Sequence, residues 1–218
     1  LNAANIALAA INAQRETFKD AESIRVHPII TRGGDLVNVV PADVRLETFV
    51  RGKTNEAIMD ANIKVDRALR AGAMAIGAKV EINTLPGYMP LQDDRNLQKL
   101  FLQNAELLFG AAECTETGHR TGSTDMGDIS HIMPAVHPSM SGASGISHGS
   151  DFLITDKEMA YLAPAKALAL LAVDLLYENA QKAKEILAQH KPIMTKEEYL
   201  AYQNKIFQKE IFDGEAGT

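Results

Sequence analysis

The segment from Gly122 to Phe152 holds the side chains best suited to chemistry. It places imidazole and carboxylate groups within a stretch rich in Gly, Ser and Pro; these groups are Asp125, Asp128, His131, His137, His148 and Asp151. Imidazoles and carboxylates on loops at strand ends are the usual materials of metal sites and acid–base sites. Each histidine taken alone is more typical of a solvated surface loop. The cluster is therefore open to two interpretations, a functional site or a polar surface loop with solvated side chains.

Glycine and proline interrupt this segment too often for one regular helix. The pattern instead predicts a short strand from Ile129 to Val136, which runs into a flexible glycine loop ending at His148. Such a loop would carry the candidate histidine at the end of a strand.

Composition excludes several classes of function. The formal net charge of −6 and the absence of a Lys/Arg-rich run argue against nonspecific nucleic-acid binding. The single cysteine, Cys114, excludes an intrachain disulfide framework and fits a reducing compartment, so we expect a cytoplasmic protein. The longest apolar run, Ala163 to Leu176, is interrupted by Lys166 and Asp174, and we expect no membrane association.

The first ninety residues predict a small domain of helices and strands. The expected order is helix, strand, strand, helix, strand, over Leu1–Phe18, Ser23–Thr31, Val44–Arg51, Thr54–Gly77 and Lys79–Leu85. A ferredoxin-like arrangement of this kind requires one more strand before the first helix. The missing strand and the absence of an initiating Met lead us to expect a fragment of a longer protein.

Residues 91–218 predict a second domain with little sheet. We expect a helix from Asp93 to about Phe109, a polar loop from Thr115 to Thr124, and a long helix that has Pro164 in its first turn and runs to about Gln189. A capping box beginning at Thr195 predicts a last helix, followed by a disordered tail from Asp213. One strand and three helices are too little for a complete α/β domain.

Three motifs in order carry a resemblance to a known family. They are the run GGDLVNVVP from Gly33 to Pro41, Arg51, and the run GASGISH from Gly142 to His148. Together they resemble the aminoacylase/carboxypeptidase family of dinuclear metallopeptidases, over Leu1 to about Asn179. The Gly-Ser-Thr-Asp at Gly122 to Asp125 is similar to the subgroup related to aminobenzoyl-glutamate hydrolase.

The resemblance implies a fold and an activity. The fold class would be α/β: a ferredoxin-like lid, also the dimerisation domain, over residues 1–90, then the C-terminal part of an α/β zinc-peptidase-like catalytic domain over residues 91–218. The activity would be hydrolysis of the amide bond of N-acyl or N-aroyl amino acids at two divalent metal ions, with zinc expected and manganese as the alternative. The family's catalytic His, Asp and Glu would precede Leu1, so we expect no catalytic residue in this chain and no activity from it alone.

The resemblance also assigns individual residues. His148 would be a metal ligand, and Gly142 and Gly145 would let the backbone approach the substrate. Asn38 would direct an amide donor toward the substrate or the oxyanion, although Asn after a glycine pair also closes turns. Arg51 would pair with the substrate's α-carboxylate, although a strand arginine is also commonly just solvated.

Several points stay open at the level of sequence. Asp125, Asp128 and His131 have no assigned role, and His137 is a candidate for lining the pocket. We expect the segment from Val37 to Val40 to pair with the strand ending at Arg51, which would place Asn38 and Arg51 on one surface. The rival interpretation is a non-catalytic dimerisation or ligand-binding module with the same fold.

Overall fold

The computed structural model describes residues 1–120 and 122–217. Thr121, within the expected polar loop, and Thr218, the last residue of the expected tail, lie outside the described residues. The chain forms two compact units; the first comprises Leu1–Pro90, His119–Thr124 and Lys196–Thr218, and the second Leu91–Gly118 and Asp125–Thr195. All of residues 91–218 were expected in one domain, whereas the segment Lys196–Thr218 belongs to the first unit.

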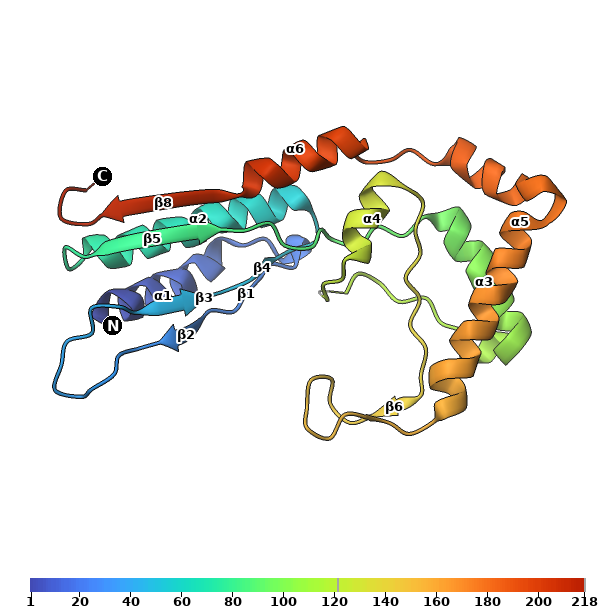
Figure 1. The fold of residues 1–218 in the computed structure, drawn as a ribbon, viewed down its shortest axis with the longest axis horizontal. Coiled ribbons are helices and arrows are strands. Elements are labelled where there is room, and N and C mark those ends of the chain that lie inside the picture. Colours follow the sequence, from blue (N-terminus) through green and yellow to red (C-terminus); the bar gives the residue numbers. More distant parts are fainter. Residues whose placement is uncertain (121, 218) are drawn as a thin grey trace. The chain divides into compact units, whose positions relative to one another are not determined.

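The first unit contains two long helices and three small sheets (Figure 1). Its elements in chain order are α1 (Asn2–Gln14), β1 (Arg25–Val26), β2 (Ile29–Arg32), β3 (Arg45–Glu47), β4 (Val50–Arg51), α2 (Asn55–Met74), β5 (Lys79–Thr84), α6 (Lys196–Ile206) and β8 (Gln208–Asp213). Helices together with small sheets are consistent with the expected α/β class.

Helices α1 and α2 pack against each other through small side chains. Thr54 caps α2, because its side-chain oxygen accepts a hydrogen bond from the Ala57 N–H at 3.2 Å. A Cβ atom placed on Gly72 would lie 2.4 Å from the carbonyl oxygen of Ala3. Only glycine therefore permits this close approach of the two helices. Ile11, Val26, Val65 and Ala68 form the buried core beside this contact.

Strands β1 to β4 form one antiparallel hairpin in two parts. Arg25 lies opposite Arg51, and Ile29 lies opposite Glu47 further along the same pair of strands. Pro28 lies between the two parts, where it cannot donate a backbone hydrogen bond. The two strands expected here are confirmed. The expected pairing of Val37–Val40 with the strand ending at Arg51 is wrong, since that segment lies in the loop between β2 and β3.

Strand β8 pairs with β5 along six residues, from Lys79 opposite Asp213 to Thr84 opposite Gln208. The Arg70 guanidinium of α2 donates two hydrogen bonds to the Glu210 carboxylate, at 2.6 and 2.5 Å. A helix followed by a disordered tail was expected here, and this strand was missed. Its sequence shows no clear alternation, and its pairing depends on a partner far away in the chain.

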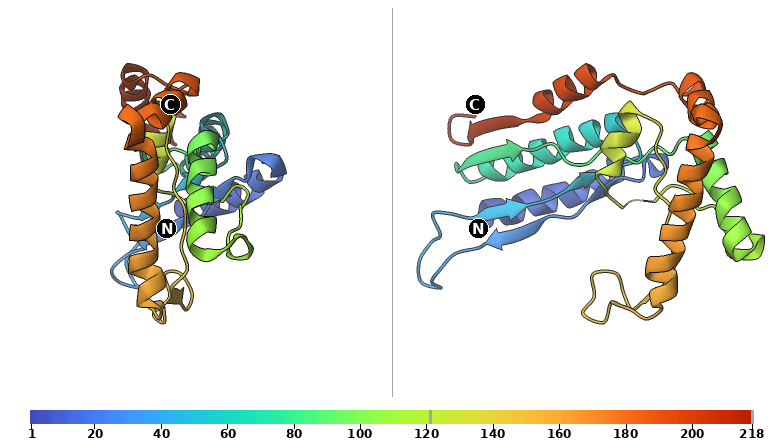
Figure 2. Two further views of the ribbon diagram at one scale, coloured as in Figure 1. Left: turned by 90° about the vertical axis from the view of Figure 1, so that its right-hand side faces the viewer. Right: turned by 45° about the vertical axis from the view of Figure 1, so that its right-hand side comes forward.

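The second unit consists mainly of the helix pair α3 (Arg95–Phe109) and α5 (Ala163–Gln189), which Figure 2 shows side by side. Its smaller elements are α4 (Met126–Ile132), β6 (Ala143–Ser144), β7 (Leu153–Ile154) and a π-helical turn at Glu158–Leu162. Phe101 and Ala105 of α3 pack with Ala167 and Leu171 of α5 in a buried core. The helix expected from Asp93 to Phe109 and the early Pro164 of α5 are confirmed.

Helix α5 is broken at Tyr177–Ala180, where the sequence predicts a continuous helix. Glu178, Asn179 and Ala180 all adopt left-handed backbone angles, with φ between 47° and 60°. Asn104 bonds to Asp174 at 2.7 Å, and Asn96 bonds to Gln189 at 3.0 Å. Asn96 lies about two turns before Asn104, but Gln189 lies about four turns after Asp174, so straight helices would leave the second pair about 10 Å apart. The break makes both contacts compatible.

The segment Glu158–Gln189 is long and apolar enough to cross a membrane by length and composition alone. Ala167 and Leu171 within it pack into the core of the second unit, while only 17% of its apolar window is buried. A core helix passes the same test of length and composition, so the finding assigns no membrane role.

Replacing Gly72 with Ala should destabilise the chain. Alanine favours a helix over glycine by up to about 1 kcal/mol, but the added methyl would collide with the α1 backbone at Ala3. We expect a net loss of about 1–3 kcal/mol in the free energy of unfolding, measured by urea denaturation followed by circular dichroism. Gly118→Ala is the matched control, because no atom lies within 4 Å of its added Cβ. A Gly72→Ala chain as stable as the wild type would contradict the close packing of α1 on α2.

Candidate functional site

The loop that carries His148 is a short hairpin. Ala143 and Ser144 of β6 pair with Ile154 and Leu153 of β7. Between them the chain turns tightly, with the Gly149 N–H donating to the Ile146 carbonyl at 2.7 Å. His148 lies exposed in this turn with a left-handed φ of 67°. Its imidazole is therefore free to bind a group outside the described residues.

Gly142 and Gly145 have structural reasons to be glycine. Gly142 has φ +121°, and a Cβ there would lie 2.7 Å from the Ala160 N. Gly145 has φ +90°, and a Cβ there would lie 2.3 Å from the Asp151 carbonyl oxygen. Both glycines thus allow the hairpin to close on itself and on the start of the following helical segment. Approach to a substrate by these two residues stays a prediction.

The prediction of a strand from Ile129 to Val136 is wrong. The first part of this segment belongs to α4, which ends at Ile132; the next residue, Met133, is extended with φ −153° and ψ 162°. Met133 precedes Pro134, and a residue before proline is forced out of helical geometry. His131 is buried in α4, and its Nδ1 lies 2.8 Å from the Gly127 carbonyl oxygen. Because a carbonyl only accepts, Nδ1 carries the proton in this contact.

The other polar residues of the segment lie at the start of α4 or in the loop that follows it. Asp125 is the N-cap residue of α4, and Asp128 lies in its first turn, where a carboxylate favours the helix dipole. His137 is exposed, and its backbone N–H donates to the Asp93 carboxylate at 3.2 Å. No catalytic role follows from these positions.

A metal site cannot be completed from the described residues. Across residues 1–120 and 122–217, no group of three or more His, Cys, Asp or Glu side chains is arranged to hold a metal ion. Zinc sites in proteins take at least three protein ligands. The described residues therefore do not form a dinuclear centre by themselves; the sequence led us to expect only one ligand, His148, from this chain.

Asn38 lies at the tip of the loop between β2 and β3. The loop tip turns with the Val39 N–H donating to the Leu36 carbonyl at 3.3 Å. The loop base is held by Asp43, which lies 2.8 Å from Arg45 and 3.1 Å from Arg32. The hydrogen bond from Arg45 lowers the pKa of the Asp43 carboxyl. Asn38 is thus presented on a loop with a well-held base and an exposed tip.

Arg51 lies at the other end of the same hairpin. It is half-buried, and its guanidinium carbon lies 5.3 Å from the centre of the Phe49 ring. Along the strand, Arg45 and Arg51 are about 20 Å apart, and Asn38 lies beyond Arg45. The structure therefore does not bring Asn38 and Arg51 together within the first unit. Gly142, Gly145 and His148 belong to the second unit.

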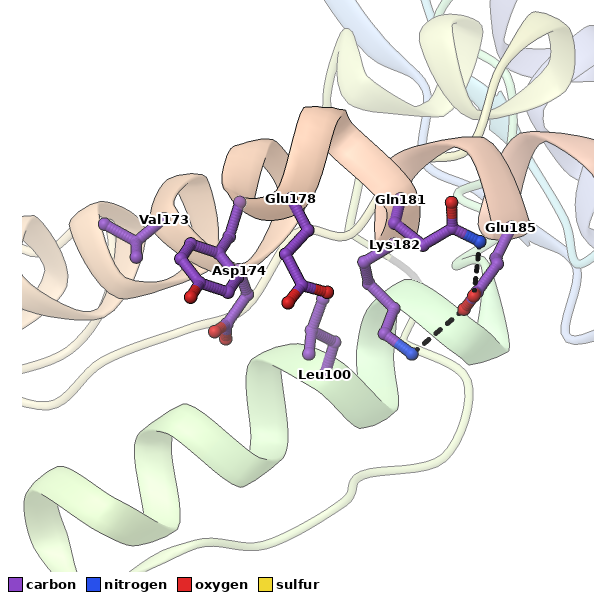
Figure 3. A pocket seen from close by; sticks show the side chains of 8 residues that line it. Leu100, Val173, Asp174, Glu178, Gln181, Lys182 and Glu185 are labelled. Carbon is purple, nitrogen blue, oxygen red and sulfur yellow. Dashed lines mark hydrogen bonds and ion pairs between the residues drawn. The ribbon is translucent and has the colours of Figure 1, made fainter.

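A pocket of about 540 Å³ lies in the second unit beside the break in α5 (Figure 3). Its lining residues come from α3 and α5: Leu100, Val173, Asp174, Tyr177, Glu178, Gln181, Lys182 and Glu185. Asp174 and Glu185 are engaged by Asn104 and by Lys182, respectively. None of the residues singled out from the sequence lines this pocket.

Sequence reasoning missed a contact between Asp94 and His190. The carboxylate accepts from the Asn96 and Leu97 N–H groups, each at 3.0 Å, and its other oxygen lies 2.8 Å from His190 Nδ1. Burial acts to raise the pKa of Asp94, but the three hydrogen bonds together outweigh burial, so the pKa lies below its usual range. Asp94 before the apolar pattern of α3 signals an N-cap, but no local pattern indicates His190 as its partner.

Replacing Asp94 with Ala should lower the free energy of unfolding by about 1–2 kcal/mol at pH 7. The folded pKa of Asp94 is lowered, so its stabilisation is present above the unfolded pKa and lost as pH falls through the folded pKa. The gap between wild type and Asp94→Ala should therefore narrow from about pH 5 to about pH 2 in urea titrations. Asp93→Ala, at the exposed neighbouring carboxylate, is the control and should cost less. A gap of constant size across this range would refute the assignment.

Comparison with known proteins gives two relatives. No protein-family model matches the chain. The Xaa-Arg dipeptidase of Homo sapiens is 28% identical over 186 residues, which cover 82% of this chain and 42% of the human protein. The Xaa-Arg dipeptidase of Mus musculus is 28% identical over 189 residues, which cover 83% of this chain and 43% of the mouse protein. The chain thus spans about two fifths of the length of the curated relatives it matches. This similarity supports a peptidase or amidohydrolase family for the chain.

Proposed function

We propose that this chain is part of a metal-dependent hydrolase that cleaves the amide bond of N-acyl or N-aroyl amino acids. The observation that carries the proposal is the similarity to two dipeptidases over more than four fifths of the chain. A dipeptide and an N-acyl amino acid share the reacting amide and the free α-carboxylate beside it. Binding of that α-carboxylate is the step that we propose for residues of this chain.

Arg51 is the residue we propose for carboxylate binding. Its planar guanidinium can donate two parallel hydrogen bonds to a carboxylate. The Phe49 ring beside it restricts the motion of the guanidinium, so less conformational freedom is lost on binding. Asn38, on the exposed loop tip, is proposed as an amide donor to a different part of the substrate.

The remaining features of the proposal concern the whole protein. The first unit would serve as a ferredoxin-like lid that pairs with a second copy through a strand edge or through α2. His148 would supply one ligand to a zinc or manganese centre whose other ligands come from outside the described residues. Its exposed position in the hairpin turn leaves the imidazole available for this role. When bound, the metal ions would polarise the amide carbonyl.

The alternative is a non-catalytic module that binds a small carboxylate ligand or a second copy. Residues 1–120 and 122–217 hold no complete metal-ligand set, which both possibilities allow, because the remaining ligands were expected before Leu1. Amide hydrolysis by the whole protein separates the two, because a binding module would show none.

Replacing Arg51 with Ala in the whole enzyme should weaken transition-state binding by about 2–5 kcal/mol. Arg51→Lys should rescue only part of the loss, because an ammonium group cannot make the two-pronged contact. The measurement is kcat/KM for an N-benzoyl amino acid and for its methyl ester, with wild type and with Arg51→Ala. With the wild type, kcat/KM for the ester should be lower than for the acid by about the same factor. With Arg51→Ala, kcat/KM for the ester should be little lower than for the acid.

Arg45→Ala is the control, since Arg45 lies on the same hairpin and is already paired with Asp43. Esterifying the substrate and replacing Arg51 with Ala each lower kcat/KM. If the α-carboxylate contacts Arg51, the two losses in transition-state binding energy should not add. Simple additivity of the two losses would show that Arg51 does not bind the α-carboxylate.

A further inference from the structure

We propose that Arg25 and Arg51 together form a binding site for a ligand that carries two carboxylates. The proposal rests on the proposed function for the role of Arg51 and adds Arg25 as a residue that determines specificity. Its basis is the register of the hairpin, which places the two arginines directly opposite each other on β1 and β4.

The two arginines share the outer face of the hairpin. Their neighbours Val26 and Val50 also lie opposite each other, and Val26 is only 2% exposed because it packs into the core of the first unit. Successive side chains on a strand point to opposite faces, so Arg25 and Arg51 point away from that core. The exposed state of Arg25 and the half-buried state of Arg51 agree with this placement.

Two like charges directly opposite each other on a sheet destabilise the pair. The same hairpin solves this problem elsewhere, because Arg32 and Arg45 share the carboxylate of Asp43. Within the described residues, neither Arg25 nor Arg51 forms an ion pair with a carboxylate. Their positive charges are thus uncompensated, and an anionic ligand would relieve the repulsion between them.

The surroundings of the pair leave this charge in place. Lys53 follows two residues after Arg51, just beyond the end of β4, and adds a further positive charge to this end of the hairpin. The nearby Glu22 carboxylate is engaged by Lys19 at 3.1 Å. Glu47, the acidic residue of the hairpin on this face, lies opposite Ile29 and is displaced along the strand. Among residues 1–120 and 122–217, no carboxylate is therefore ion-paired with either arginine in the position proposed for the ligand.

The geometry favours a dicarboxylate over a single acid. Directly opposite residues in an antiparallel pair have Cα atoms about 4.5–5.5 Å apart. Two guanidinium groups at this spacing can each bind one carboxylate of a short diacid. Phe49, which is 70% exposed and lies beside Arg51, adds an apolar surface for the adjoining part of the ligand. A ligand with a cationic side chain would be repelled by Arg25.

The test is direct binding to the 218-residue chain, measured by isothermal titration calorimetry. Three probes share an N-benzoyl group: N-benzoylglutamate has two carboxylates, N-benzoylglycine has one, and N-benzoylarginine has one together with a cation. We expect N-benzoylglutamate to bind about fivefold to tenfold more tightly than N-benzoylglycine. N-benzoylarginine should bind most weakly. Raising the salt concentration should reduce the preference for the diacid.

The variants separate the two arginines. Arg25→Ala should remove the preference for the diacid, so that N-benzoylglutamate binds no more tightly than N-benzoylglycine. Arg51→Ala should weaken the binding of both acids. Arg45→Ala is the matched control on the same hairpin and should change neither affinity, since Asp43 already holds that guanidinium.

Three results would overturn the proposal: equal binding of the diacid and the monoacid by the wild type, an equal loss of both in Arg25→Ala, and no binding of any probe. Binding of inorganic phosphate as tight as that of N-benzoylglutamate would show that the site binds anions in general. This result would also overturn the proposal. The test is independent of catalysis. If the whole protein hydrolyses no amide but the diacid preference holds, the proposed function fails and the two-arginine site stands.

Discussion

The close contact between α1 and α2 at Gly72 is the constraint on which the first unit depends. The backbone of α1 at Ala3 occupies the space that a side chain at position 72 would need. Because the helices lie this close, Ile11 of α1 and Val65 of α2 meet Val26 of the hairpin in a single core. The inward valine in turn fixes which face of the hairpin points outward. The position of Arg25 and Arg51 on that outer face is therefore a consequence of helix packing.

The second unit shows tertiary contacts overruling local preference. The sequence Tyr-Glu-Asn-Ala at Tyr177–Ala180 contains neither glycine nor proline, and Asn179 is its single weak signal for the end of a helix. Left-handed backbone at non-glycine residues costs about 1–2 kcal/mol per residue. The contacts of Gln189 with Asn96 and of His190 with Asp94 lie on the far side of the break and hold the last turns of α5 against the start of α3. These contacts offset the backbone cost.

The sequence predicted the elements whose signals are local and long. Helix α2 begins with a Thr54 cap and continues with regular apolar spacing, and the strands around Arg25 and Arg51 alternate cleanly. Strand β8 was missed because its stability comes from pairing with β5, more than a hundred residues earlier. Helix α4 was mistaken for a strand because its seven residues are too few to show a helical period. The break in α5 was not predicted either, because the contacts that stabilise it involve residues of α3, far away in the chain.

The candidate site divides into residues that the fold explains and residues that it does not. Gly142 and Gly145 are required by close backbone contacts within their own hairpin, so they need no substrate to account for them. His148 is different, because it holds a left-handed φ of 67° in an exposed turn and its side chain makes no hydrogen bond within the described part of the chain. Arg25 and Arg51 repel each other, which weakens the hairpin that carries them, and only Arg51 has a contact in return, with the Phe49 ring. Residues that cost stability and gain little from the fold are those for which a ligand gives a physical explanation. By this criterion His148 and the arginine pair are the residues for which we propose ligand roles, and the glycines account for the closing of the hairpin that carries His148.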